Sequence, residues 1–241
     1  MDILLVLAVL PAILLFVLVY KNDTGHRESP GMIAKMFAFG CLSAFVAGAI
    51  ETVGCTLIDA VGLDRYGTII YDLVMYIIVV ALAEELAKFL FLLTTIDDNR
   101  FNYTFDGMTY AVAIGLGFAT LENIMYVLGT WSAYTAIVRG VLSVPLHCTC
   151  AVFMGYFFGY ARRCFVENDH AGAFGYALLS LAIPVAIHGF YDFAIENEIT
   201  WIAAAGLLFT ITAFVLAFLH LRKASRANVL LSAEEPPFTR F

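Results

Sequence analysis

The chain has 241 residues, of which 62% are hydrophobic and 14% are charged, and its mean hydropathy is +0.88. An ordinary soluble domain is about 45–50% apolar and about 25% charged, so this composition excludes a soluble protein and indicates a polytopic membrane protein. The net charge of −7 argues against a nucleic-acid partner, which requires a basic surface. The cysteines are odd in number, five, and lie in or beside apolar runs, so no disulfide framework is expected.

A helix needs about 20 apolar residues to cross a bilayer. Seven runs approach or exceed that length and predict an all-α bundle of about seven transmembrane helices: 2–20, 32–58, 68–95, 107–128, 134–160, 173–195 and 201–221. The connections between them are too short for a separate soluble domain. We therefore expect one transmembrane domain, 1–223, followed by a mobile cytoplasmic tail, 224–241.

The positive charges are distributed unevenly between the two ends of these spans. Arg65 and Arg139 lie on one side and Lys88 lies inside a span, which leaves ten of the 13 lysine and arginine residues for the other side. Cytoplasmic loops carry an excess of lysine and arginine. The sequence therefore predicts an integral protein of a prokaryotic cytoplasmic membrane, with its N-terminus outside and its C-terminus in the cytoplasm.

Several polar side chains lie inside the predicted spans, where a charged group costs several kcal/mol unless it has a partner or a function. They come from five of the seven spans: Glu51, Glu84, Glu85, Lys88, Glu122, Asn123, His147, His188 and Asp192. Intramembrane ionisable groups face the interior of the bundle and pair with one another. We expect one shared polar site between the third and sixth spans, whereas Glu51 is interpreted as a structural hydrogen-bonding residue.

The spacing of these residues predicts particular pairs. Glu84 and Lys88 are four residues apart on one helical face, so they can form an ion pair, and His188 and Asp192 have the same spacing. Glu85 points about 100° away from Glu84, because a helical turn takes about 3.6 residues. The two glutamates therefore have different tasks. Cys150 lies one turn after His147, which leaves a thiolate ligand conceivable.

Carboxylates and imidazoles can hold a divalent metal with one open position, and a further glutamate can take a proton from the bound water. Zinc is the expected ion for such a site, although a glutamate and a histidine could also activate water without metal. The predicted metal ligands are Glu122, His147, His188 and Asp192. The same cluster would suit a proton- or metal-coupled transporter, although no internal repeat is evident. A scaffold in which the polar groups only hold the bundle together is a third alternative.

Four short motifs in chain order resemble those of the PrsW-type intramembrane proteases, relatives of the CAAX prenyl endopeptidases. The resemblance covers somewhat over half the chain, from the third to the sixth span. The matching segments are Glu84-Glu85-x-x-Lys88, Phe118-x-x-x-Glu122-Asn123, Arg139 through His147, and His188-x-x-x-Asp192.

The resemblance implies cleavage of a single-pass membrane protein, typically an anti-sigma factor, as the first cut in regulated proteolysis. It also implies that Glu84 activates the water, with Glu122, His147 and His188 around it. On this interpretation the catalytic residues are Glu84, Glu85, Glu122 and His188, and the supporting residues are Lys88, Asn123 and Cys150. The role of Glu85 stays open between a ligand and a residue that supports one.

Overall fold

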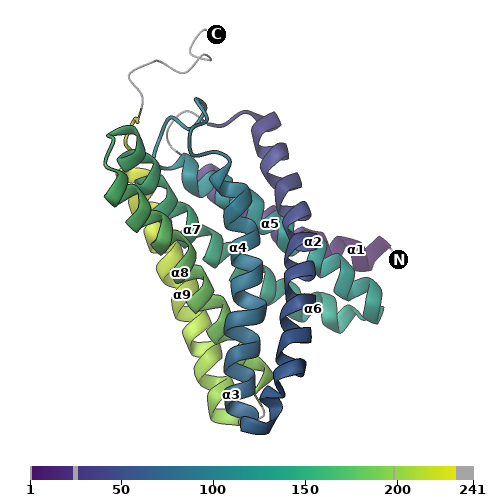
Figure 1. Cartoon of the computed structure of the whole chain (residues 1–241). Coiled ribbons are helices and arrows are strands. Elements are labelled where there is room, and N and C mark those ends of the chain that lie inside the picture. Colours follow the sequence, from purple (N-terminus) through teal and green to yellow (C-terminus); the bar gives the residue numbers. More distant parts are fainter. Residues whose placement is uncertain (1, 24–26, 198, 232–241) are drawn as a thin grey trace.

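The computed structural model describes residues 2–23, 27–197 and 199–231, and these form a bundle of helices (Figure 1). The longer helices are α1 (Asp2–Lys21), α2 (Pro30–Val61), α5 (Asp106–Thr130), α7 (Ser143–Val166), α8 (His170–Glu196) and α9 (Thr200–Arg226). Within the described residues the β structure consists of an isolated bridge between Tyr103 and Leu230. The predicted all-α class is confirmed.

Six runs of helix are long and apolar enough to cross a membrane within the described part of the chain. A seventh run extends from α3 (Thr68–Leu73) through a π-helical segment (Val74–Ala81) into α4 (Leu82–Leu93). It coincides with the predicted span 68–95. π-Helical turns are rare in proteins overall, but many of those that occur lie at functional sites. This one ends three residues before Glu84.

The predicted span 134–160 lies within a helical run, Ala133–Val166, that is apolar enough to cross a membrane, but the run is not one uninterrupted helix. It is broken at Leu142 into α6 (Ala133–Val141) and α7. The physical reason is Pro145, because a proline ring clashes with the carbonyl four residues earlier, here that of Val141. Pro145 is tolerated as the third residue of α7, where a backbone N–H needs no helical partner.

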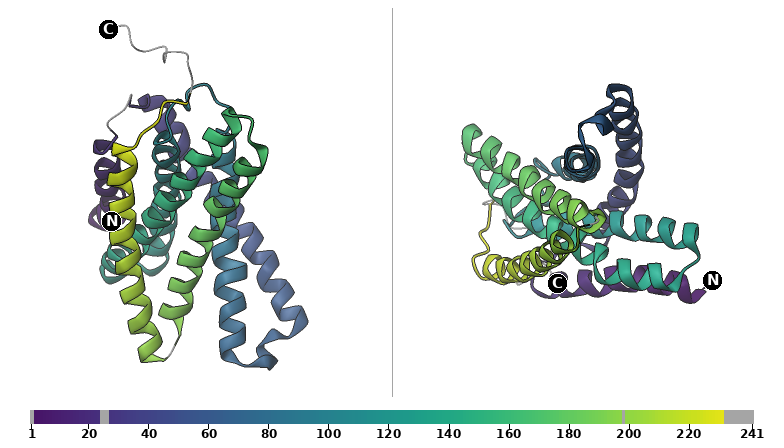
Figure 2. Two further views of the ribbon diagram at one scale, coloured as in Figure 1. Left: turned by 90° about the vertical axis from the view of Figure 1, so that its left-hand side faces the viewer. Right: turned by 90° about the horizontal axis from the view of Figure 1, so that it is seen from below.

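Two groups of helices diverge in the bundle. Figure 1 shows α1, α6 and the C-terminal part of α5 projecting to one side, and Figure 2 shows the same arrangement from below. Helices α2, α8 and α9 extend further toward the end that holds the turn before α3. Helices α5 and α7 pack against each other at the centre, with α2 on α5 and α8 on α7.

Glycines permit these central contacts, because small residues let helix backbones approach closely. A Cβ on Gly40 of α2 would lie 2.0 Å from the carbonyl oxygen of Ile114 in α5. A Cβ on Gly155 of α7 would lie 2.4 Å from the carbonyl oxygen of Gly107. Gly48 differs, because nothing lies within 4 Å of such a Cβ.

The C-terminal segment continues the fold beyond residue 223. Helix α9 runs to Arg226, and the backbone N–H of Leu231 then donates to the carbonyl oxygen of Asn102. The side chain of Asn228 accepts from the backbone N–H of Phe105 at 3.0 Å. The rest of the expected tail, 232–241, lies outside the described residues, so its mobility stays a prediction.

Candidate active site

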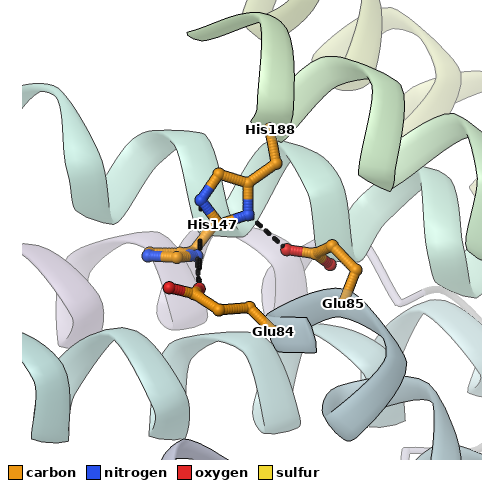
Figure 3. Close-up of side chains that lie close together, drawn as sticks. All are labelled: Glu84, Glu85, His147 and His188. Atoms are coloured by element: carbon orange, nitrogen blue, oxygen red, sulfur yellow. Dashed lines mark hydrogen bonds and ion pairs between the residues drawn. The ribbon is translucent and has the colours of Figure 1, made fainter. Parts of the chain in front are cut away.

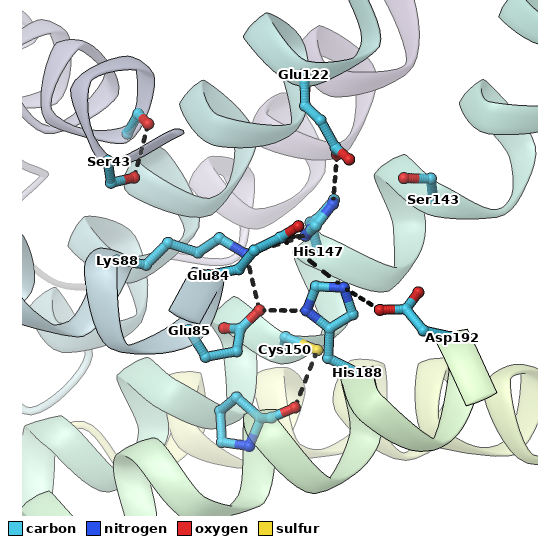
Figure 4. A network of polar contacts seen from close by, with 12 residues as sticks. Ser43, Glu84, Glu85, Lys88, Glu122, Ser143, His147, Cys150, His188 and Asp192 are labelled. Atoms are coloured by element: carbon cyan, nitrogen blue, oxygen red, sulfur yellow. Dashed lines mark hydrogen bonds and ion pairs between the residues drawn. The ribbon is translucent and has the colours of Figure 1, made fainter. Parts of the chain in front are cut away.

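The polar side chains of four helices meet at the centre of the bundle (Figure 4). Helix α4 contributes Glu84, Glu85 and Lys88, and α5 contributes Glu122. His147 comes from α7, and His188 comes from α8 together with Asp192. The structure therefore brings together the residues that the sequence predicts to share a site.

The Lys88 ammonium group lies at the inner side of this cluster. Its Nζ is 2.7 Å from Oε1 of Glu85 and 3.3 Å from Oε2 of Glu84. It is also 3.1 Å from Nδ1 of His147 and 3.9 Å from the ring centre of Phe118. Lys88 pairs with Glu84 as its spacing predicts, but its shorter contact is with Glu85.

His147 links Lys88 to Glu122. An ammonium group only donates hydrogen bonds, so Nδ1 of His147 accepts and the proton of the neutral ring is on Nε2. That nitrogen lies 2.9 Å from Oε2 of Glu122. The same carboxylate oxygen is 2.8 Å from Nη2 of Arg139 on α6. Arg139 in turn donates to the hydroxyl of Ser143 and covers the ring of Tyr126.

His188 lies between two carboxylates. Its Nδ1 is 2.8 Å from Oε1 of Glu85, and its Nε2 is 3.2 Å from Oδ2 of Asp192. The second contact is the pair that the four-residue spacing predicts. Nε2 of His188 is also 3.9 Å from Oε2 of Glu84, and the rings of His147 and His188 meet edge to face at 5.0 Å (Figure 3).

A cavity of about 440 Å³ opens beside this cluster. Glu84, Glu122, His147, His188 and Asp192 line it, whereas Glu85 and Lys88 lie behind its wall. The side chain of Glu85 is 0% exposed, and that of Glu84 is 8% exposed. The two adjacent glutamates therefore have different surroundings, one facing the cavity and the other enclosed by Lys88 and His188.

Two predicted supporting residues point elsewhere. The Asn123 amide donates to the carbonyl oxygen of Ala8 at 2.8 Å and so joins α5 to α1. The thiol of Cys150 donates to the carbonyl oxygen of Pro184 at 3.7 Å and joins α7 to α8. Neither residue lines the cavity.

Charged residues outside the predicted site also line the cavity, namely Glu51, Arg139 and Glu196. Glu51 reaches it from α2, and Arg139 reaches it from α6. Arg139 is one of the two basic residues that the predicted topology places on the side with few lysines and arginines. That unusual position could have indicated that Arg139 has a role in the site. Nothing in the local sequence distinguishes Glu51 from a structural hydrogen-bonding residue.

The donor set suits a divalent cation. One ligand atom from each of Glu84, Glu85, His147 and His188 lies within 4.8 Å of the others, and all four residues are buried. Four carboxylates, counting Glu122 and Asp192, face the two basic side chains Lys88 and Arg139 and the imidazole of His188, which contacts three of them. Buried charge requires compensation, so the excess negative charge favours a cation. This group of four shares His147 and His188 with the predicted metal ligands. The other two predicted ligands contact these rings instead, Glu122 that of His147 and Asp192 that of His188.

The fold and this site define a polytopic membrane protein with a buried carboxylate and imidazole centre, the arrangement of an intramembrane hydrolase. Residues 28–220 match the PrsW family of intramembrane metalloproteases. The chain belongs to this family and is an intramembrane peptidase.

Curated relatives match over most of the chain. Protease PrsW of Geobacillus kaustophilus is 30% identical over 223 residues, which cover 91% of this chain and 90% of the relative. Protease PrsW of Shouchella clausii is 31% identical over 93% of this chain and 99% of the relative. Protease PrsW of Bacillus subtilis is 31% identical over 80% of this chain and 82% of the relative. No solved structure matches the chain significantly.

Proposed function

We propose that this peptidase hydrolyses a peptide bond of a single-pass membrane protein with a water molecule that Glu84 activates. The observation that carries the proposal is the difference between the two glutamates. Glu84 lines the cavity, whereas Glu85 is enclosed and accepts from Lys88 and His188. A general base must reach the water from which it takes the proton. Glu84 meets that condition and Glu85 does not.

The proposed reaction proceeds in two steps. Glu84 takes a proton from water in the cavity as the water oxygen bonds to the carbonyl carbon of the substrate. The carbon–nitrogen bond then breaks, and Glu84 returns the proton to the leaving amine. Arg139, which lines the cavity, is a donor toward the negative charge that develops on the carbonyl oxygen.

We further propose that His147 and His188 hold a divalent ion beside Glu84, with zinc as the expected metal. When bound, it would polarise the carbonyl and lower the pKa of water. Glu122 keeps the ring of His147 oriented, in the manner of carboxylates that hydrogen-bond metal-binding histidines. Glu85 would do the same for His188, because its Oε1 lies 2.8 Å from Nδ1 of that ring.

The substrate class and the orientation complete the proposal. The excess of lysine and arginine at the end that holds the α9 C-terminus supports a cytoplasmic C-terminus, and hence a cavity in the half of the membrane away from the cytoplasm. An anti-sigma factor with an extracytoplasmic domain, cut first at this site, fits that arrangement. Family membership favours hydrolysis over the transporter alternative.

The test is cleavage in reconstituted liposomes. Purified protein is incubated with single-pass anti-sigma factors, and the products are sequenced by mass spectrometry. We expect cleavage by the wild type and by Glu51→Gln, a matched control for a carboxylate that lines the cavity, and none by Glu84→Gln. Cleavage that persists in Glu84→Gln would exclude Glu84 as the base. Fusions of a reporter enzyme to the C-terminus test the orientation separately.

A further inference from the structure

Helices α1 and α2 are consecutive in the chain but diverge in the bundle. Helix α1 packs on α5, α6 and α7, and α2 packs on α5, α4 and the π-helical segment. A groove of about 520 Å³ lies between them. Its walls come from both helices and its floor from α5, through Val9, Ala12, Ile13, Phe16, Tyr20, Pro30, Ile33, Ala34, Phe37, Leu116 and Thr120.

The groove is apolar along its length. Thr120 is a polar exception, but its hydroxyl donates to the carbonyl oxygen of Leu116 at 2.6 Å within α5. The groove therefore offers hydrocarbon contact and requires little hydrogen bonding from an occupant. Helices α1, α2 and α5 are apolar enough to span a membrane. Any molecule that occupies the groove between them must therefore itself be apolar.

One end of the groove is cationic. The groove ends at Tyr20 and Pro30, where Lys21 closes α1 and α2 begins. The guanidinium of Arg27 lies 5.3 Å from the ring centre of Tyr20, and both Lys21 and Arg27 are exposed. Among the described residues, no carboxylate forms an ion pair with either of them. The carboxylate of Glu28 is turned inward and accepts from the hydroxyl of Tyr110 at 2.6 Å.

The start of α2 adds to this positive charge. A helix N-terminus carries partial positive charge and unpaired N–H groups that favour phosphate. Ser29 caps one of them by accepting from the N–H of Met32 at 3.2 Å. A Cβ placed on Gly31 would have nothing within 4 Å, so the space beside this turn is open.

We propose that the groove binds one anionic phospholipid, with its acyl chains between α1 and α2 and its phosphate beside Arg27 and Lys21. An apolar groove with a cationic end matches both parts of such a lipid. A transmembrane helix of a protein partner would fill the groove but leave the two cations without a counter-charge. The site lies on a different face of α5 from Glu122, so the proposal is independent of the catalytic assignment.

Native mass spectrometry of the full-length protein in detergent tests the site. The probes are phosphatidylglycerol and phosphatidylcholine with identical acyl chains. We expect tighter retention of phosphatidylglycerol, and a loss of about fivefold for each of Lys21→Gln and Arg27→Gln. Lys35→Gln is the control, because Lys35 is exposed on α2 but covers Phe39 outside the groove. Equal retention of both lipids, or no change in Arg27→Gln, would overturn the proposal.

A second experiment tests the groove itself. Ala34→Phe places a ring in the groove and should lower retention of both lipids, whereas Ala49→Phe, at an exposed position of α2 outside the groove, should leave it unchanged. A photo-crosslinking residue at position 34 should form an adduct with the mass of a lipid in native membranes. An adduct with a polypeptide would identify a protein occupant and contradict the lipid assignment, as would unchanged retention in Ala34→Phe.

Discussion

Nδ1 of His188 and Oε1 of Glu85 lie 2.8 Å apart and join α8 to α4 behind the wall of the cavity. The same oxygen accepts from Lys88 at 2.7 Å. Glu85 is thus the member of the paired glutamates that holds two helices and a buried cation in place. This arrangement predicts different consequences for changes at the two adjacent glutamates.

Glu84→Gln should remove activity with little effect on stability, whereas Glu85→Gln should affect both. Loss of a general base costs about 10²–10⁴-fold in rate. Loss of the enclosed Glu85 carboxylate leaves Lys88 with the 3.3 Å contact to Glu84 as its one carboxylate partner and should cost about 3–5 kcal/mol of unfolding free energy. Thermal unfolding in detergent and cleavage rates in liposomes measure the two effects. A Glu85→Gln protein as stable as the wild type would contradict this division.

Lys88 and Glu85 should be coupled energetically. Lys88→Met alone leaves two adjacent buried carboxylates without their cation and should be strongly destabilising. Replacing a buried ion pair by neutral groups costs less than removing one partner. The double variant Lys88→Met with Glu85→Gln should therefore be more stable than Lys88→Met. A double-mutant cycle on unfolding free energies measures the coupling, and additive effects would show that the pair contributes nothing.

Arg139 should position Glu122 and the ring of His147. The Arg139→Gln variant loses the 2.8 Å ion pair, so we expect a lower cleavage rate. Arg139→Lys keeps the charge but not the planar group that covers Tyr126, and should restore the rate in part. If the lysine variant is as inactive as the glutamine variant, charge is not the reason for the effect. Unfolding temperatures of both variants provide the control for misfolding.

Metal content should depend on the imidazoles. Elemental analysis of the purified wild type should find one divalent ion per chain. His147→Ala and His188→Ala should lower that occupancy, and Cys150→Ser should not, because its thiol contacts Pro184 instead. Chelation should abolish cleavage and zinc should restore it. A fully active wild type without bound metal would support activation of water by Glu84 alone.

Gly155 should tolerate no side chain. An added Cβ would lie 2.4 Å from backbone atoms of α5, so Gly155→Ala should destabilise the bundle by about 1–3 kcal/mol through overpacking. Gly175→Ala in α8 is the matched control, since nothing lies within 4 Å of its Cβ. Alanine is the better helix former by about 0.5–1 kcal/mol, so the control should be neutral or stabilising. Equal unfolding temperatures for the two variants would contradict the close packing of α5 and α7.

The sequence by itself determined the membrane class, the approximate spans and the polar residues that meet. These follow from local properties, because span length, apolar content and the cost of a buried charge can be read from consecutive residues. It also predicted the pairs Glu84–Lys88 and His188–Asp192, since a four-residue spacing on one helix fixes a shared face. The break in 134–160 was less evident, although Pro145 was a local signal for it.

Only the tertiary structure decided which of the adjacent glutamates faces the cavity. Their 100° difference in direction is a property of one helix, but the outcome depends on where α7 and α8 lie around that helix. The same holds for Glu51, which reaches the cavity because α2 passes there, and for Asn123, which turns to α1. Contacts between helices depend on how the helices pack, and the sequence of one helix does not specify its neighbours.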